Sequence, residues 1–271
     1  MAMLSMNELT TYRWSFEDDV RRYADVGIRS IGVWRQKLSD YGEEKGIELL
    51  SETGLHASNL MWAGGFTGSD GRSYNDALAD ARDAIRLTAD LQADCLIVYS
   101  GSRGGHTTNH ASRLLNDALK ALIPVAMEFE VTLAIKPMDA GCANDWTFLT
   151  ELAETVDLLE KFDSPVIKLA FDTYHFGLDP TAIELLGDIV PRIAIVQLGD
   201  AKQRPTGEQN RCRLGEGAVP FAEILSKLAD GGYQGSYDVK LFGEDVEPFD
   251  YDDLLAHSIR KFESWQTSPP S

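Results

Sequence analysis

The hydrophobic residues of this chain gather in eight short runs, and each run is followed by a stretch with helical spacing of its apolar positions. Short apolar runs bounded by polar residues are typical of strands covered on both faces, as in a parallel sheet. The pattern therefore predicts repeated strand–helix units. The predicted strands cover residues 3–9, 30–34, 56–62, 95–99, 131–135, 166–171, 193–198 and 236–242.

Helix signals stand between these runs. Ser15 is an N-cap with an acid three residues on, and Gly27 ends the helix that it opens. Asp179 followed by Pro180 is a second N-cap, with proline at the first helical position. Pro124 lies inside a long helical stretch and is expected to kink it. Further helices are predicted at 35–54, 73–91, 109–130, 147–162, 221–228 and 251–265.

The number of repeats indicates the fold. Eight strand–helix units in 271 residues are typical of an α/β (β/α)8 TIM barrel, so we predict one such barrel over residues 1–271. A doubly wound open sheet also alternates strands and helices and is the alternative. Eight repeats would be many for an open sheet of this size, and no linker or composition shift divides the chain.

Composition excludes several classes of partner. The formal charge of −18 argues against nucleic acid and anionic membrane surfaces, because phosphate binding needs a concentrated basic surface. The three cysteines, Cys95, Cys142 and Cys212, have no CxxC spacing, which argues against a disulfide scaffold and a structural zinc site. No signal peptide or membrane-spanning run is evident, so we expect a cytoplasmic protein.

In a barrel the carboxyl ends of all strands open onto one face, where catalytic residues gather. Asp172 and His175 directly follow the strand at 166–171. In a structural interpretation, Asp172 caps the next turn and His175 packs under a loop. The polar and aromatic residues expected at this face are Arg13, Trp34, Trp62, Tyr99, Arg103, His106, Lys136, Asp172, His175, Gln197, Asp200, Arg213 and Lys240.

Three of these side chains belong to apolar strands. Lys136 follows VTLAI, Gln197 stands in AIVQLGD, and Lys240 stands in YDVKLFG. Burying such groups is costly unless they face a polar cavity or a partner, and side chains alternate along a strand. We therefore expect them to face the barrel interior at a functional site. The alternative is a structural ion network in which Lys136 and Lys240 flank Asp172.

Weaker candidates surround them. The glycine-rich segment ending in His106 could cradle an anion or be a plain loop. Trp34 and Trp62 could stack on a substrate or pack in the core. The polar loop 201–217 could close over an anionic ligand or balance an acidic surface, and Asp200 precedes it. Its basic residues are Lys202, Arg204, Arg211 and Arg213.

Five segments, in this order, carry a family resemblance: LAIKPMDAGCANDW, KLAFDTYHFG, AIVQLGD, RCRLGEG and GSYDVKLF. They resemble the sugar phosphate isomerase/epimerase family, whose members have the xylose-isomerase-like barrel. The resemblance covers nearly the whole chain and implies a (β/α)8 barrel that acts on small carbohydrates such as ketoses or keto-inositols. It also implies a homodimer as one oligomeric state, because related barrels often pair.

In that family four side chains bind a divalent ion, often manganese: a glutamate on strand five, an aspartate on strand six, a histidine on strand seven and a glutamate on strand eight. The two glutamates also move a proton at the carbon next to a carbonyl. Asp172 matches the aspartate, and His175 matches a nearby substrate-contacting histidine. Lys136, Gln197 and Lys240 replace the other three ligands. Ammonium groups have no lone pair for a metal, so we expect no bound metal and no other cofactor.

Three hypotheses follow for the function. In the first, a ketose, keto-inositol or derivative undergoes proton transfer next to its carbonyl, with Lys136, Lys240 and Asp172 catalytic. In the second, one lysine forms a Schiff base, as in a lyase or aldolase. In the third, the barrel binds carbohydrate without catalysis. The expected substrate contacts are His175, Gln197, Arg213, Trp34, Trp62, His106 and Asp200.

Overall fold

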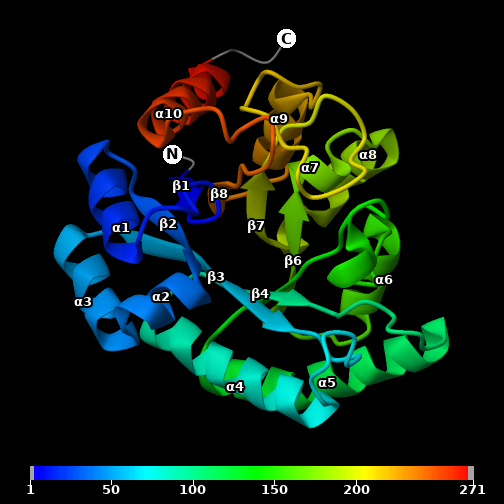
Figure 1. Cartoon of the computed structure of the whole chain (residues 1–271). Helices are drawn as coiled ribbons and strands as arrows, with labels where there is room; N and C mark the ends of the chain where they lie inside the picture. The colour runs from blue at the N-terminus through cyan, green and yellow to red at the C-terminus, as the bar shows by residue number, and fades with distance from the viewer. Residues whose placement is uncertain (1–2, 268–271) are drawn as a thin grey trace.

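The computed structural model describes residues 3–267 and contains a closed barrel of parallel strands in sequence order (Figure 1). The last strand pairs with the first, with Ser5 opposite Asp238, and this pairing closes the barrel. The predicted TIM barrel is confirmed, and the open doubly wound sheet is wrong. The strands are β1 (Met3–Asn7), β2 (Ser30–Trp34), β3 (His56–Gly64), β4 (Leu96–Tyr99), β5 (Leu133–Ile135), β6 (Ile167–Asp172), β7 (Ile193–Leu198) and β8 (Ser236–Val239).

Helices surround the barrel on its outside (Figure 1). Ser15 and Asp179 are N-caps as predicted. The stretch predicted as one helix over 35–54 is divided at Gly42, whose φ of +106° suits glycine alone. The helices are α1 (Phe16–Asp25), α2 (Arg35–Tyr41), α3 (Glu43–Thr53), α4 (Tyr74–Asp90), α5 (Thr108–Glu128), η1 (Ala143–Asp145), α6 (Leu152–Glu160), α7 (Thr173–Phe176), α8 (Pro180–Ile189), η2 (Val190–Arg192), α9 (Phe221–Asp230) and α10 (Tyr251–Thr267).

Two hydrophobic clusters follow from the alternation of side chains along the strands. Leu133, Ile135 and Leu169 point outward and pack against the helices. Ala134 and Ala170, from the same strands, belong to a separate cluster inside the barrel. A residue two positions after an inward-facing alanine also faces inward, which is the geometry that the sequence predicted for the polar strand ends.

A buried polar layer lies inside the barrel. Asp238 accepts hydrogen bonds from the amides of Asn7 (2.6 Å), Asn59 (3.1 Å) and Gln197 (3.1 Å), all on one carboxylate oxygen. A Cβ on Gly32 would lie 2.6–2.9 Å from the polar atoms of Asn7, Asp238 and Asn59. Glycine at this position of β2 therefore leaves room for the layer.

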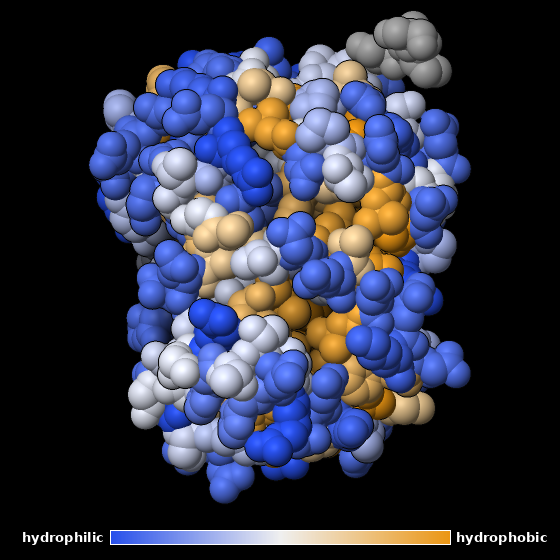
Figure 2. All heavy atoms as spheres, turned by 90° about the vertical axis from the view of Figure 1, so that its right-hand side faces the viewer, coloured by the Kyte–Doolittle hydropathy of each residue, from blue (hydrophilic) through white to orange (hydrophobic). Residues whose placement is uncertain are grey.

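The outer surface is dominated by hydrophilic residues. On the side where α6 and α8 lie, these residues surround a hollowed band of hydrophobic ones (Figure 2). Within the described part of the chain, no helix is both long and apolar enough to cross a membrane.

Candidate functional site

The polar residues at the ends of β5, β6 and β7 meet inside the barrel mouth. Asp172 ends β6 and stands opposite Gln197 of β7 in the strand register, and Lys136 directly follows β5. The ammonium group of Lys136 donates to Asp172 Oδ2 at 2.7 Å and to Gln197 Oε1. All three side chains are completely buried. The structure thus brings these three predicted residues together.

Arg211 joins this group from the loop 201–217. Its Nη1 and Nη2 each lie 3.2 Å from an oxygen of Asp172, and its guanidinium stacks on the ring of Tyr174 at 3.9 Å. Its Nη2 also donates to Glu208 Oε2 at 3.1 Å. The structure places Arg211, fully buried, where the sequence analysis expected Arg213.

Arg213 lies outside the group. Its guanidinium pairs with Glu216 and stacks on Phe249 at 3.8 Å, at a partly exposed position. The sequence indicated this basic loop, and within it the structure places Arg211, not Arg213, on Asp172. The identical charge of Arg211 and Arg213 gave no signal to separate them.

Asp172 is the centre of the charge arrangement. Burial by itself would raise its pKa, but Arg211 and Lys136 outweigh burial and hold the pKa well below the usual range of a carboxyl group. Burial would likewise lower the pKa of Lys136, yet Asp172 raises it above its ordinary value. Lys136 is therefore a fixed cation. Asp172 also accepts from the backbone N–H of Tyr174 at 3.0 Å, so it caps α7 as well as binding these cations.

Lys240 has no such partner. It directly follows β8, and its backbone N–H donates to the carbonyl of Leu198 in β7 at 2.9 Å. Only 3% of the residue is exposed, and within residues 3–267 its ammonium group makes no hydrogen bond or ion pair. Burial lowers its pKa to about 7, with further lowering by Lys136 and Arg211. Lys240 is thus a buried amine that is available in its neutral form near pH 7.

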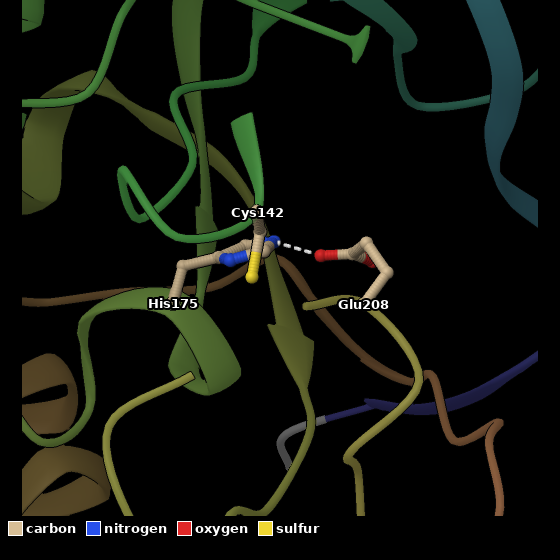
Figure 3. A group of neighbouring side chains, drawn as sticks. All are labelled: Cys142, His175 and Glu208. Atoms are coloured by element: carbon tan, nitrogen blue, oxygen red, sulfur yellow. Dashed lines mark ion pairs between the residues drawn. The ribbon is translucent and has the colours of Figure 1, made fainter. Parts of the chain in front are cut away.

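His175 lies beside Asp172 in a second group with Glu208 and Cys142 (Figure 3). Its Nε2 is 3.0 Å from Glu208 Oε1 and 3.7 Å from Asp172 Oδ2. Burial lowers the pKa of the imidazole, so it is neutral over most of the physiological range. The sequence predicted His175 but neither Glu208 nor Cys142, because both belong to loops without a periodic pattern.

An aromatic wall lines the same mouth. Trp62 meets Trp146 edge to face with ring centroids 5.0 Å apart, and Tyr99 lies 5.3 Å from Trp146. Trp34 and Trp62 are half-buried and pack against the hydrophobic cluster inside the barrel. These positions are consistent with both interpretations of the tryptophans, as core residues and as a stacking surface.

His106 and Asp200 lie outside the charged group. His106 Nε2 is 3.1 Å from the carbonyl oxygen of Thr67, and its ring stacks on His110 with centroids 4.6 Å apart. The carboxylate of Asp200 instead folds the loop that carries Arg211. It accepts from the backbone N–H groups of Ala201, Gly215, Gly217 and Val219.

Comparisons with known proteins agree with this architecture. Residues 20–265 match the family described as xylose isomerase-like TIM barrel. The chain is 30% identical over 236 residues to a D-psicose 3-epimerase of Enterocloster bolteae, covering 80% of this chain and 70% of that protein.

Among solved structures, protein SMc04130 of Sinorhizobium meliloti 1021 superposes with a TM-score of 0.88 at 24% identity, covering 96% of this chain and 97% of that one. An L-ribulose 3-epimerase superposes with a TM-score of 0.80 at 18% identity, covering 98% and 94%. The expected resemblance is confirmed: this chain belongs to the xylose isomerase-like TIM barrel family.

Proposed function

We propose that this protein is an isomerase or epimerase of a small ketose, keto-inositol or derivative that moves a proton next to the carbonyl group with Lys240 as the base. The observation that carries the proposal is a buried, unpaired amine beside the fixed cations Lys136 and Arg211. The relatives named D-psicose 3-epimerase and L-ribulose 3-epimerase support a ketose as the substrate class.

The proposal includes no manganese at Asp172. Both oxygens of Asp172 already accept hydrogen bonds from cationic side chains, Lys136 on one and Arg211 on both. A divalent ion at this place would have to displace these groups and lie among ammonium and guanidinium charges. Manganese and magnesium bind mainly through carboxylate, carbonyl and water oxygens, and three of the four family positions offer none that is ionised.

Lys240 suits the role of base because a lysine must be neutral to accept a proton. With a pKa of about 7, roughly half of the Lys240 side chains are neutral at pH 7. The amine takes the proton from the carbon next to the carbonyl, and the electron pair of the broken C–H bond moves to the carbonyl oxygen as an enolate. Return of a proton to the opposite face of that carbon gives the epimer. Return of a proton to the former carbonyl carbon, with proton transfer between the two oxygens, gives the isomer.

Lys136 suits the complementary role. Because Asp172 keeps it charged, its ammonium group is a permanent positive charge on the β5 side of the mouth, across from β8. A fixed cation stabilises the developing enolate oxygen without reorganising at the moment of reaction. Asp172 itself then acts by holding Lys136 and Arg211 in place.

The test is deuterium incorporation from D2O next to the carbonyl of D-psicose and L-ribulose, followed by NMR. We expect incorporation by the unaltered protein and its loss in Lys240→Met, with no manganese retained after dialysis against excess MnCl2. One tightly held equivalent of manganese that is lost in Asp172→Asn would contradict the lysine site. Absence of incorporation from both sugars, with saturable binding of either, would favour the carbohydrate-binding barrel.

A Schiff base is the second candidate, because a neutral unpaired amine is also the form that attacks a carbonyl carbon. Borohydride added with D-psicose distinguishes the two reactions. Reduction of an imine would attach the sugar to Lys240 covalently and increase the protein mass. Proton transfer alone leaves the mass unchanged.

A further inference from the structure

Three donor atoms of different chemistry converge over the barrel mouth, in the group of Cys142, His175 and Glu208 (Figure 3). One ligand atom from each residue lies within 4.8 Å of the other two. The residues come from three successive connections: Cys142 follows β5, His175 lies in α7 after β6, and Glu208 belongs to the loop after β7. Each of these loops opens onto the carboxyl face of the barrel.

We propose that Cys142, His175 and Glu208 bind one zinc-class divalent cation. The site is separate from the manganese position of the family, because none of its three ligands is a strand residue that corresponds to the family ligands. It is also independent of the proposed function, since neither Lys240 nor Lys136 takes part in it.

An unsatisfied polar atom indicates that something is bound here. Nδ1 of His175 is buried and makes neither a hydrogen bond nor an ion pair, and Nε2 of His175 and Oε1 of Glu208 form an ion pair with each other without hydrogen-bond geometry. His175 as a whole is 2% exposed. A buried polar atom without a partner loses its hydrogen bonds to water and gains none in return, so such atoms are rare in the absence of a ligand. A cation bound by His175 and Glu208 would satisfy one atom of each.

The distances fit a small cation after a minor adjustment. Ligand atoms bound to tetrahedral zinc at about 2.0–2.3 Å are separated from one another by about 3.4–3.6 Å. His175 Nε2 and Glu208 Oε1 are 3.0 Å apart, so they need to separate slightly. The remaining separations, at most 4.8 Å, need to shorten by up to about 1.2–1.4 Å. Three protein ligands leave a fourth position for water or a substrate oxygen.

The donor types select the metal. Thiolate and imidazole ligands favour zinc and cobalt over manganese and magnesium. Cys142 as thiolate and Glu208 as carboxylate would each contribute negative charge to the cation, with the charge of Glu208 shared with Arg211. Of the neighbouring cations, Lys136 is paired with Asp172, and Arg211 binds Glu208 through Oε2, which leaves Oε1 free for the metal.

The position of Glu208 gives the metal a structural consequence. Its loop also carries Arg211 and covers the buried group around Asp172. A cation bound to Cys142, His175 and Glu208 would fasten this loop to the barrel. CxxC spacing could not indicate such a site, because its ligands are distant in sequence and meet only through the barrel topology.

The test uses Co2+ as a spectroscopic probe on the full chain under reducing conditions. We expect one equivalent to bind with a near-ultraviolet thiolate-to-cobalt absorption band. Cys142→Ser should remove the band, and Glu208→Gln should weaken Zn2+ binding, measured by competition, by more than ~100-fold. Cys212→Ser is the matched control, because Cys212 is also buried but lies outside the group, and it should keep the band.

Two results would overturn the proposal. Either Co2+ does not bind, or the absorption band survives in Cys142→Ser. If Co2+ binds without a thiolate band, and Asp172→Asn abolishes this binding, the metal site is instead the family position at Asp172. Because the absorption band does not depend on turnover, the metal site can be confirmed while the proposed isomerase or epimerase activity fails, and the reverse.

Discussion

Replacing Lys240 with methionine should stabilise the fold, whereas the same replacement of Lys136 should destabilise it. Methionine keeps an unbranched side chain of similar length and removes the charge. Lys240 is buried without a partner, so folding must remove its proton or bury its charge. Lys136 is buried on Asp172, so its removal leaves part of a buried carboxylate uncompensated.

The magnitude follows from the pKa of Lys240, which falls from 10.5 to about 7 on folding. Between these values the unfolded chain binds more protons than the folded chain, so stability rises with pH across this window. The cost of burying Lys240 is about 4 kcal/mol at pH 7 and about 2 kcal/mol at pH 9. Lys240→Met should recover these amounts, and Lys136→Met should lose about 3–5 kcal/mol.

Urea unfolding at both pH values, followed by tryptophan fluorescence and circular dichroism, measures the free energy of unfolding of each variant. The reasoning requires the advantage of Lys240→Met to shrink as the pH rises. A loss of stability in Lys240→Met at pH 7 would refute it. That result would mean that Lys240 is charged and belongs to a stabilising ion network with Asp172 and Glu208.

Three further predictions use matched pairs or a single titration. Gly32→Ala should lower the free energy of unfolding in urea by about 1–3 kcal/mol, because its Cβ meets the buried polar layer. Gly187→Ala in α8, with open space around it, should raise the free energy of unfolding by up to about 1 kcal/mol. Arg211→Lys should lower the free energy of unfolding by about 2–3 kcal/mol, since lysine cannot bind both oxygens of a carboxylate. Arg213→Lys, at a partly exposed ion pair, should lower it by under about 1 kcal/mol. Equal losses in the two variants would contradict the assignment of Arg211. The rate of deuterium incorporation should rise with pH through about 7 and then level off as Lys240 loses its proton, and a rate that falls over this range would exclude Lys240 as the base.

The barrel and part of its polar centre could be predicted because both depend on regular strands. Alternation along a strand fixes the direction of each side chain, so Lys136 shares the inward direction of Ala134, and Asp172 that of Ala170. Apolar neighbours made these polar residues conspicuous in the sequence. The direction in which they point required no knowledge of the loops.

The loop residues could not be predicted in the same way. Arg211 and Arg213 share one polar loop and one charge, and only tertiary contacts separate them. Isolated bridges from Asp200 to Cys212 and from Asn210 to Gly243 fix the path of the chain on either side of Arg211. These contacts join segments whose patterns are irregular. For the same reason no sequence pattern indicated that Glu208 would reach His175.

The arrangement of charges explains how Lys240 would serve the proposed catalysis although it costs stability. Lys136 and Arg211 are balanced by Asp172 and Glu208, so the unbalanced cation of the site is Lys240. In the resting protein burial, and after it the repulsion by Lys136 and Arg211, lowers the pKa of Lys240 and keeps much of it neutral. In the proposed reaction the amine would take a proton from the substrate, and the enolate formed in the same step would supply the missing negative charge. On this proposal the site is complementary to the charge distribution of the intermediate and not to that of the free ketose. Such complementarity is the condition for an electrostatic effect to accelerate a reaction.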